Sequence, residues 1–193
     1  MVFSSLTFLC IFLPVVLALY YLLPTLRIRN VLLIIVSLLF YAYGEPVYVL
    51  LMIASIIINY IFGRLLGTEN KKKRQWILAI AVIINIGLLV VFKYLDMMVQ
   101  TINQLSGSEI PLAGLALPIG ISFFTFQALS YVIDVYRREV EPQKNLWNVM
   151  LYISFFPQLI AGPIVKYHDI QEQIDNRNTD VKEIAEGLIR FII

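Results

Sequence analysis

The sequence predicts an all-α protein, a polytopic transmembrane helix bundle with one re-entrant or broken element near residues 145–165. Composition is the first observation behind this prediction. Of the 193 residues, 60% are hydrophobic and 15% are charged, and the mean hydropathy is +0.81, whereas a soluble domain is about 45–50% apolar and about 25% charged. Apolar runs long enough to cross a bilayer also recur along the chain. Positive charges gather in segments between these runs, which is typical of cytoplasmic loops.

Charge and cysteine content exclude several classes of function. The net charge is only +2, and no basic segment is interleaved with aromatic residues, so nucleic acid is not an expected partner. Cys10 is the single cysteine, which rules out an internal disulfide. The sequence has neither a CxxC pair nor a histidine cluster, so we expect no metal site.

Residues 3–23 form the first expected span. This segment lacks the basic start and the small-residue cleavage site of a signal peptide, which favours a retained helix. Pro14 is expected to kink the helix, which neighbouring helices tolerate within a membrane, and Pro24 is expected to end it.

Residues 28–44 and 47–66 are the next two expected spans, separated by the break Gly44-Glu45-Pro46. The apolar part of the first is short, so a half-membrane re-entrant piece remains the alternative to a crossing of a locally thinned bilayer. Asn59 is the only amide in the span 47–66, and we expect it to bond a neighbouring helix.

Residues 76–99 form the fourth expected span. The cluster Lys71–Arg74 precedes it and marks a cytoplasmic loop; an anionic-lipid site there is the alternative interpretation. Lys93 and Asp96 are three residues apart, a spacing that predicts an ion pair on one helical face.

The fifth expected span, residues 112–136, carries more polar groups than a lipid-facing helix needs. A polar side chain without a partner is costly in hydrocarbon, so these groups are expected to line an internal path. The alternative is a buried helix whose hydroxyls bond its own carbonyls. Asp134 and Arg137 are expected to pair near the inner end. The polar residues are Ser122, Thr125, Gln127, Ser130, Tyr131 and Asp134.

Residues 145–165 are uncharged but contain Pro157, Gly162 and Pro163, which make a continuous helix improbable. We expect a re-entrant or interfacial element there, because broken backbone at membrane depth needs protein or water around it. A further amphipathic helix is expected from Asp180, and the chain stops at Ile193 within an apolar run. Residues 1–193 are therefore expected to be the N-terminal portion of one longer multi-span domain.

The basic segments alternate consistently with the expected spans. The positive residues after the first, third and fifth spans all fall on one side, which predicts a cytoplasmic location for these residues and an N-terminus on the outer side of the membrane. These residues are Arg27, Arg29, Lys71 to Arg74, Arg137 and Arg138.

Two blocks of sequence carry a family resemblance. LPIGISFFTFQALSYVIDVYR at 117–137 and SFFPQLIAGPIVKYHDI at 154–170 resemble the membrane-bound O-acyltransferase family, nearest to its bacterial alginate O-acetyltransferase branch. SLLFYAYGEP at 37–46 and VVFKYLD at 90–96 also resemble that branch, and the D-alanine transfer protein of teichoic acid synthesis looks like a cousin.

The resemblance implies an enzyme whose helices surround a funnel or tunnel. An acyl group, expected to be acetyl, passes from a cytoplasmic thioester (acetyl-CoA or an acyl carrier protein) to an extracytoplasmic polysaccharide or cell-wall acceptor. No cofactor is expected to be bound, and membrane lipid and an extracytoplasmic transfer partner protein are expected partners. The catalytic histidine of the family matches nothing here, so no catalytic residue is expected in this chain. The substrate-path candidates are Ser122, Thr125, Gln127, Ser130, Tyr131, Gln158, Gly162 and Pro163.

His168 is the only histidine in the chain. We interpret it as interfacial structure, since a general base must sit inside a closed site.

Three other functions are alternatives to acetyl transfer. D-alanyl transfer to teichoic acid is the first alternative function. A transporter with substrate sites at helix breaks is the second, and a non-catalytic membrane scaffold is the third.

Overall fold

The computed structural model describes residues 5–107, 109–159, 162, 165–177, 186–187 and 189. All regular secondary structure in these ranges is helical, which confirms the predicted all-α class. In chain order the elements are the π-helical turn η1 (Phe8–Phe12) and the α-helices α1 (Leu13–Leu22), α2 (Leu26–Gly44), α3 (Tyr48–Leu65), α4 (Lys71–Ser106), α5 (Ile121–Arg137), α6 (Leu146–Ser154), α7 (Phe156–Leu159) and α8 (Tyr167–Asn176).

Within the described part of the chain, α2, α3 and α4 are long and apolar enough to cross a bilayer, and α1 with η1 is a shorter apolar helix. The protein is therefore a membrane protein. Pro14 lies in the first turn of α1, directly after η1. Because proline has no N–H to donate, it is well placed where the π-helical turn gives way to the α-helix.

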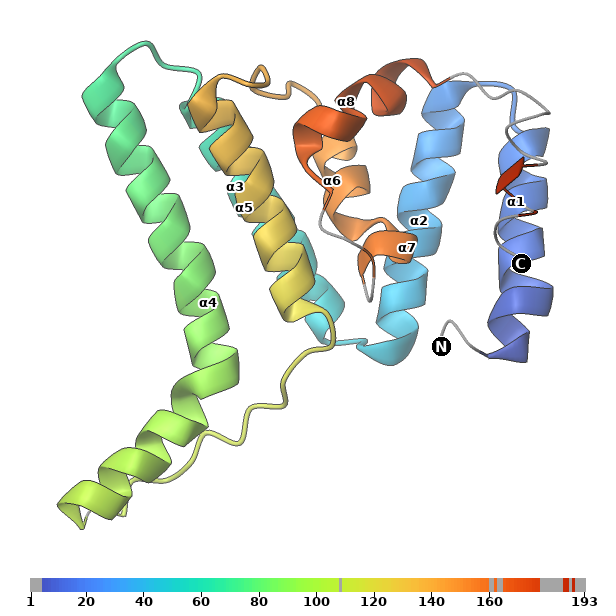
Figure 1. Cartoon of the computed structure of the whole chain (residues 1–193). Coiled ribbons are helices and arrows are strands. Elements are labelled where there is room, and N and C mark those ends of the chain that lie inside the picture. The colour runs from blue at the N-terminus through green and yellow to red at the C-terminus, as the bar shows by residue number, and fades with distance from the viewer. Residues whose placement is uncertain are drawn as a thin grey trace.

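Helix α2 is continuous over 19 residues, about 28 Å at 1.5 Å per residue. It meets α3 at the end where the chain turns between them, and α6 packs against both helices (Figure 1). This continuity favours the crossing over the half-membrane alternative. The chain turns at 45–47 and α3 starts at Tyr48, so the turn falls at the expected break.

Helix α4 runs for 36 residues and exceeds the expected 76–99 at both ends. At its start, the Asn70 side chain accepts hydrogen bonds from the N–H groups of Lys72 and Lys73 at 3.1 and 3.2 Å, as an N-cap does. At its end, Gly107 adopts φ +67°, the left-handed conformation that closes many helices. The C-terminal part of α4 extends away from the other helices (Figure 1).

Helix α5 begins at Ile121, so the expected helix start at residue 112 is wrong. The stretch 109–120 runs as an irregular strap from the far end of α4 (Figure 1). Two residues explain the late start. Pro118 lacks the N–H that a helix interior needs, and Gly120 has φ +77°, which an α-helix cannot contain.

Two expected ion pairs are also wrong. Lys93 Nζ lies 5.5 Å from the centre of the Tyr94 ring, while Asp96 Oδ1 accepts a hydrogen bond from Ala113 N–H at 2.9 Å. Asp96 therefore anchors the strap before α5. Arg137 pairs with Glu139 at 3.7 Å rather than with Asp134. Asp96 and Arg137 each bond a residue of an irregular segment, and helical spacing predicts only pairs within one helix.

Helix α5 lies at the centre of the bundle, packed against α3 and α4, and also against α6 and α8. A close approach fixes its position against α3: a Cβ on Gly63 would lie 2.5 Å from Cε1 of Tyr131. Only glycine leaves room for this ring. The rings and aliphatic chains of α5 thus belong to the main core, together with residues of α2, α3 and α6.

The broken element is confirmed. Helix α6 ends at Ser154, Phe155 adopts φ −54° and ψ 112°, and the single turn α7 follows with Pro157 inside its first turn. The chain is irregular at 165–166 and then forms α8. Proline at the second position of a helix costs no hydrogen bond, which explains why a new turn can start there.

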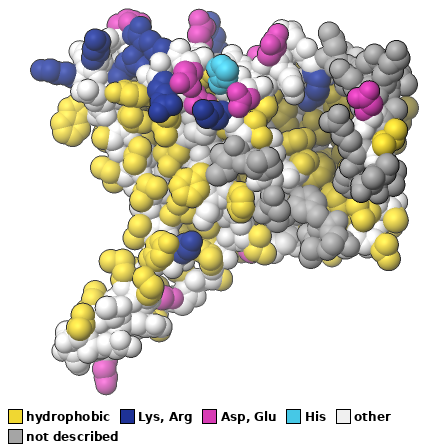
Figure 2. All heavy atoms as spheres, in the orientation of Figure 1, with side chains coloured by type: hydrophobic (Ala, Val, Ile, Leu, Met, Phe, Trp, Pro, Cys, Tyr) yellow, Lys and Arg dark blue, Asp and Glu magenta, His cyan; other side chains and the backbone are white. Residues whose placement is uncertain are grey.

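Lys and Arg side chains gather at one end of the molecule, above a broad hydrophobic band (Figure 2). The loop between α3 and α4 and the loop after α5 meet at this end. Arg74 is buried and donates to the main-chain oxygen of Tyr136 at the C-terminus of α5, where a positive charge is favoured. Arg138 pairs with Glu69. The expected clustering of the basic segments is thereby confirmed.

Candidate functional site on the inner face of α5

Gln127 lies at the centre of the candidate site. Its side chain is 2% exposed, and its amide donates to the main-chain oxygen of Tyr152 at 2.7 Å and to Gln158 Oε1 at 2.8 Å. The first bond joins α5 to α6 and the second joins it to α7. Gln127 therefore faces protein, and it bonds the segment in which the helix breaks.

The neighbouring hydroxyls of α5 differ in burial. Thr125 is fully buried, and its Oγ1 has no hydrogen-bond partner within the described structure. Ser122 and Ser130 are half-buried. An unpaired buried hydroxyl costs free energy, so Thr125 is the unsatisfied hydroxyl of this face.

Tyr131 belongs to a group of buried tyrosines at the basic end of the bundle. The Tyr167 ring contacts the rings of Tyr131 and Tyr152 edge to face, each at 5.0 Å between centroids. Gln143 holds two of them: its N–H donates to the Tyr131 hydroxyl at 3.2 Å, and its Nε2 donates to the Tyr167 hydroxyl at 2.9 Å. Burial raises the pKa of Tyr167 to about 12, so its hydroxyl stays protonated at neutral pH.

The broken element supplies the other candidates. Gln158 is half-buried and bonds Gln127, as described above. Gly162 is placed so that a Cβ would lie 2.6 Å from Cα of Gln158 and 3.1 Å from the Pro157 oxygen, so no other residue fits there. Pro163 lies outside the described residues. The structure thus brings Gln127 and Gln158 together. Among the described residues, no hydrogen bond joins Ser122 to this pair.

A cavity of about 110 Å³ opens on the other side of Gln158. Its walls come from α2, α6 and α8 and are mainly apolar. Gln158, Gln173 and Arg177 supply its polar groups, and Leu33, Leu151, Tyr152, Phe155, Ile170 and Ile174 complete the lining. Gln158 therefore connects the buried amide network of α5 with an open hollow.

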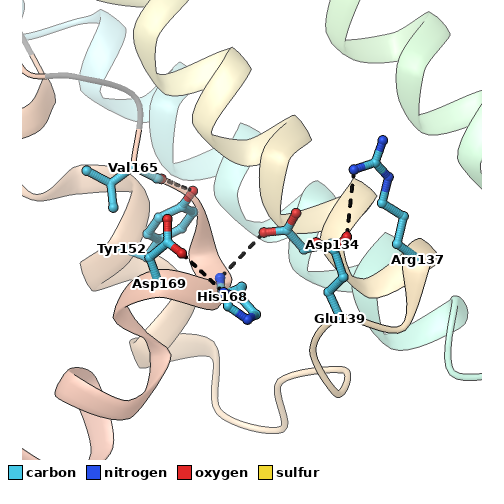
Figure 3. A network of polar contacts seen from close by, with 7 residues as sticks. All are labelled: Asp134, Arg137, Glu139, Tyr152, Val165, His168 and Asp169. Carbon is cyan, nitrogen blue, oxygen red and sulfur yellow. Dashed lines mark hydrogen bonds and ion pairs between the residues drawn. The ribbon is translucent and has the colours of Figure 1, made fainter.

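Asp134 links α5 to the start of α8 (Figure 3). Its side chain is buried, and Oδ2 accepts a hydrogen bond from the main-chain N–H of His168 at 3.5 Å. The N–H of Tyr167 also bonds this carboxylate. The first N–H groups of a helix have no partner within the helix, so a carboxylate there acts as a cap supplied by another helix.

The His168 ring points away from this interior contact. Its side chain is 57% exposed, and Nδ1 lies 3.1 Å from Asp169 Oδ1 on the same helix. Figure 3 shows His168 and Asp169 beside the Asp134 carboxylate. The Tyr152 hydroxyl, drawn in the same view, donates to the Val165 oxygen at 2.8 Å. An exposed ring is poorly suited to serve as the base of a closed site.

Sequence reasoning missed three residues of this network: Gln143, Tyr152 and Tyr167. Helical spacing marks polar positions on α5 but gives no information on which side chains of later segments meet them. A weak signal existed, because Tyr152 and Tyr167 flank the helix break at each end.

The chemistry available at the site is hydrogen bonding by amides and hydroxyls. Within the described ranges, no three His, Cys, Asp or Glu side chains come together as metal ligands. The half-open cavity at Gln158 can admit a polar group, and the amides of Gln158 and Gln173 can orient it there.

Comparisons with known proteins identify relatives along the whole chain. A probable alginate O-acetylase AlgI from Pseudomonas aeruginosa is 39% identical over 199 residues, covering 100% of this chain and 38% of the relative. The corresponding protein from Azotobacter vinelandii is 37% identical over all of this chain and 40% of its own length. A peptidoglycan O-acetyltransferase from Helicobacter pylori is 32% identical over 190 residues, covering 83% of this chain and 36% of the relative.

The chain spans about two fifths of the length of the curated relatives it matches. No family model matches it, and no solved structure matches it. Nonetheless, the identity extends over every described helix, including α5 and the broken element. The chain is therefore related over its whole length to alginate O-acetylases, which bears out its resemblance to the alginate O-acetyltransferase branch of the membrane-bound O-acyltransferase family.

Proposed function

We propose that the full-length protein is an O-acetyltransferase that moves an acetyl group onto a hydroxyl of an extracytoplasmic polysaccharide or cell-wall polymer. The observation that carries this proposal is the identity of 39% with an alginate O-acetylase over the entire chain. The peptidoglycan O-acetyltransferase among the relatives supports a carbohydrate hydroxyl as the common acceptor chemistry.

The proposed donor is a cytoplasmic thioester, either acetyl-CoA or an acyl carrier protein. The basic end of the bundle supports a cytoplasmic placement of the loops around Lys71–Arg74 and Arg138. If the basic end faces the cytoplasm of a bacterial cell, the N-terminus lies on the outer side of the cell membrane. A negatively charged donor would meet the basic loops first, and a partner protein outside the membrane would pass the group to the polymer.

In this proposal the amide network of α5, α6 and α7 positions part of the route of the acyl group. Gln127 and Gln158 are the central pair, since they join the buried face of α5 to the cavity beside α8. Thr125 contributes a buried hydroxyl with free hydrogen-bonding capacity within the described structure. Catalytic proton transfer is assigned to no residue of this chain.

The experiment uses the full-length gene in a host that exports the polymer. Membranes receive acetyl-CoA labelled in the acetyl group, and the polymer is isolated and tested for label before and after mild alkali, which cleaves O-acetyl esters. Alkali-labile label that depends on the gene supports the proposal. Label that appears from D-alanine instead would support D-alanyl transfer, and transfer of no label from either donor would favour a transporter or scaffold.

A further inference from the structure

Tyr20 of α1 contacts two arginines at the basic end of the bundle. Cζ of Arg29, from α2, is 5.1 Å from the centre of the Tyr20 ring, and Cζ of Arg177, after α8, is 5.2 Å from it. The two cations are therefore no farther apart than twice that distance. Two like charges within that separation repel each other, weakly where water screens them, and the ring contributes only a modest attraction to each.

Neither guanidinium pairs with a carboxylate among the residues that the structure describes. Arg29 Nε donates to the Leu23 oxygen at 2.8 Å, and Arg177 Nη2 donates to Asn30 Oδ1 at 2.8 Å. These neutral partners fix the positions of the side chains without cancelling their charge. A guanidinium has five N–H donors, and each of these two makes one hydrogen bond to a described residue, so donor capacity is left over.

Arg177 also lines the cavity of about 110 Å³, whose other walls are mainly apolar. The site thus combines fork-shaped cationic donors at the membrane edge with an adjoining apolar hollow. A phosphate ester suits the first feature, because guanidinium matches phosphate in two-point hydrogen bonding. An acyl chain suits the second. The ligand that has both parts is an anionic phospholipid.

We propose that Arg29 and Arg177 bind the phosphate of an anionic glycerophospholipid, with part of an acyl chain in the cavity bounded by Leu33, Ile170 and Ile174. Bound phosphate offsets the repulsion between the two cations and ties α1, α2 and the end of α8 together. Basic pockets between transmembrane helices bind lipid head groups in this way. The inference does not depend on the proposed acetyl transfer.

The test measures phospholipid binding to the purified full-length protein by native mass spectrometry from detergent. Dioleoylphosphatidylglycerol is the probe, and dioleoylphosphatidylcholine is the zwitterionic comparison. Arg29→Gln and Arg177→Gln are each expected to weaken phosphatidylglycerol binding by roughly tenfold. Arg27→Gln is the matched control, because it removes the same charge from the same turn of α2 but lies on an exposed position.

Three further results decide the interpretation. Only monodisperse protein is compared, and thermal unfolding of each variant without added lipid reports whether it is folded. Dihexanoylphosphatidylglycerol should bind more weakly than the dioleoyl lipid, because short chains fill less of the hollow, and inorganic phosphate should not compete at equal concentration. Equal losses for Arg27→Gln and Arg177→Gln, undiminished binding in both Arg29→Gln and Arg177→Gln, or full competition by inorganic phosphate would each overturn the proposal.

Discussion

The amide of Gln127 donates to Gln158 Oε1 at 2.8 Å, which joins the middle of α5 to the short turn α7 across 31 residues of sequence. The same amide donates to the Tyr152 oxygen of α6. One side chain therefore connects both parts of the broken element to the central helix. Gln158 also lines the cavity beside α8, so the same connection joins the buried face of α5 to that cavity.

Gln127→Leu should lower acetyl transfer by roughly tenfold to a hundredfold, because misplacement of a group along the route costs rate even without loss of a catalytic residue. Expression should fall much less. Initial rates of label incorporation, divided by the amount of folded protein, provide the measurement. Phe126→Leu is the matched control, since Phe126 is 43% exposed on the same helix. Unchanged turnover of Gln127→Leu would show that this face only packs.

His168→Ala should retain measurable acetyl transfer, since the ring is exposed and its hydrogen bond within the described residues is to the neighbouring Asp169. The assay is the same label incorporation, with circular dichroism to verify that the helical content is unchanged. Complete loss of activity in a folded variant would mean that His168 takes part in the reaction.

Asp134→Ala should destabilise the start of α8 by about 1–2 kcal/mol, as expected when a helix loses its capping group. Hydrogen exchange at the amides of residues 167–168 is the appropriate measurement, and exchange there should become faster. Asp169→Ala removes a neighbouring acid that is exposed, and it should leave exchange nearly unchanged. Equal effects of the two substitutions would argue against a cap from α5.

Asn59 and Asn85 bond each other reciprocally, at 3.0 and 2.8 Å, between α3 and α4. Replacing either one by leucine should destabilise the protein by roughly 0.6–2 kcal/mol, since the remaining amide is left without its partner. The double variant should lose less than the sum of the two single losses. Unfolding in mixed detergent micelles measures all three. Strict additivity would contradict a direct interaction.

Gly63→Ala should destabilise the contact between α3 and α5 by about 1–3 kcal/mol, because its methyl group would overlap the Tyr131 ring. Gly87→Ala is the control, since a Cβ there meets no other atom within 4 Å and alanine is the better helix former. Thermal unfolding of the two variants should therefore move in opposite directions. If Gly63→Ala left the unfolding temperature unchanged, the Tyr131 ring could not lie against Gly63 as described.

Several features of the fold could be predicted from the sequence, because each depends on local chemistry. The polar groups of α5, the break near Pro157 and the interhelical role of Asn59 follow from spacing, proline and the cost of polar groups in lipid. The start of α5 was misjudged because apolarity outweighed Pro118 and Gly120, although both residues argue for an interruption.

The tertiary partners could not be predicted in the same way. Asp134 bonds α8 and Asp96 bonds the strap before α5, and both partners lie on segments whose positions depend on packing. Helical spacing predicts pairs only between residues three or four positions apart on the same helix. Tyr20 and the two arginines that contact it come from three separate segments, so no single stretch of sequence indicates this cluster.

The most direct test concerns the orientation of α5 in the bilayer. Nitroxide labels are placed on cysteines at 126 and at 127 in full-length protein lacking Cys10, and power-saturation spectroscopy measures collision with oxygen, which concentrates among lipid tails. Our account predicts low oxygen accessibility at 127, where the native side chain is 2% exposed, and higher accessibility at 126. Oxygen accessibility at 127 as high as at 126, in protein that remains folded, would contradict a polar face turned into the protein.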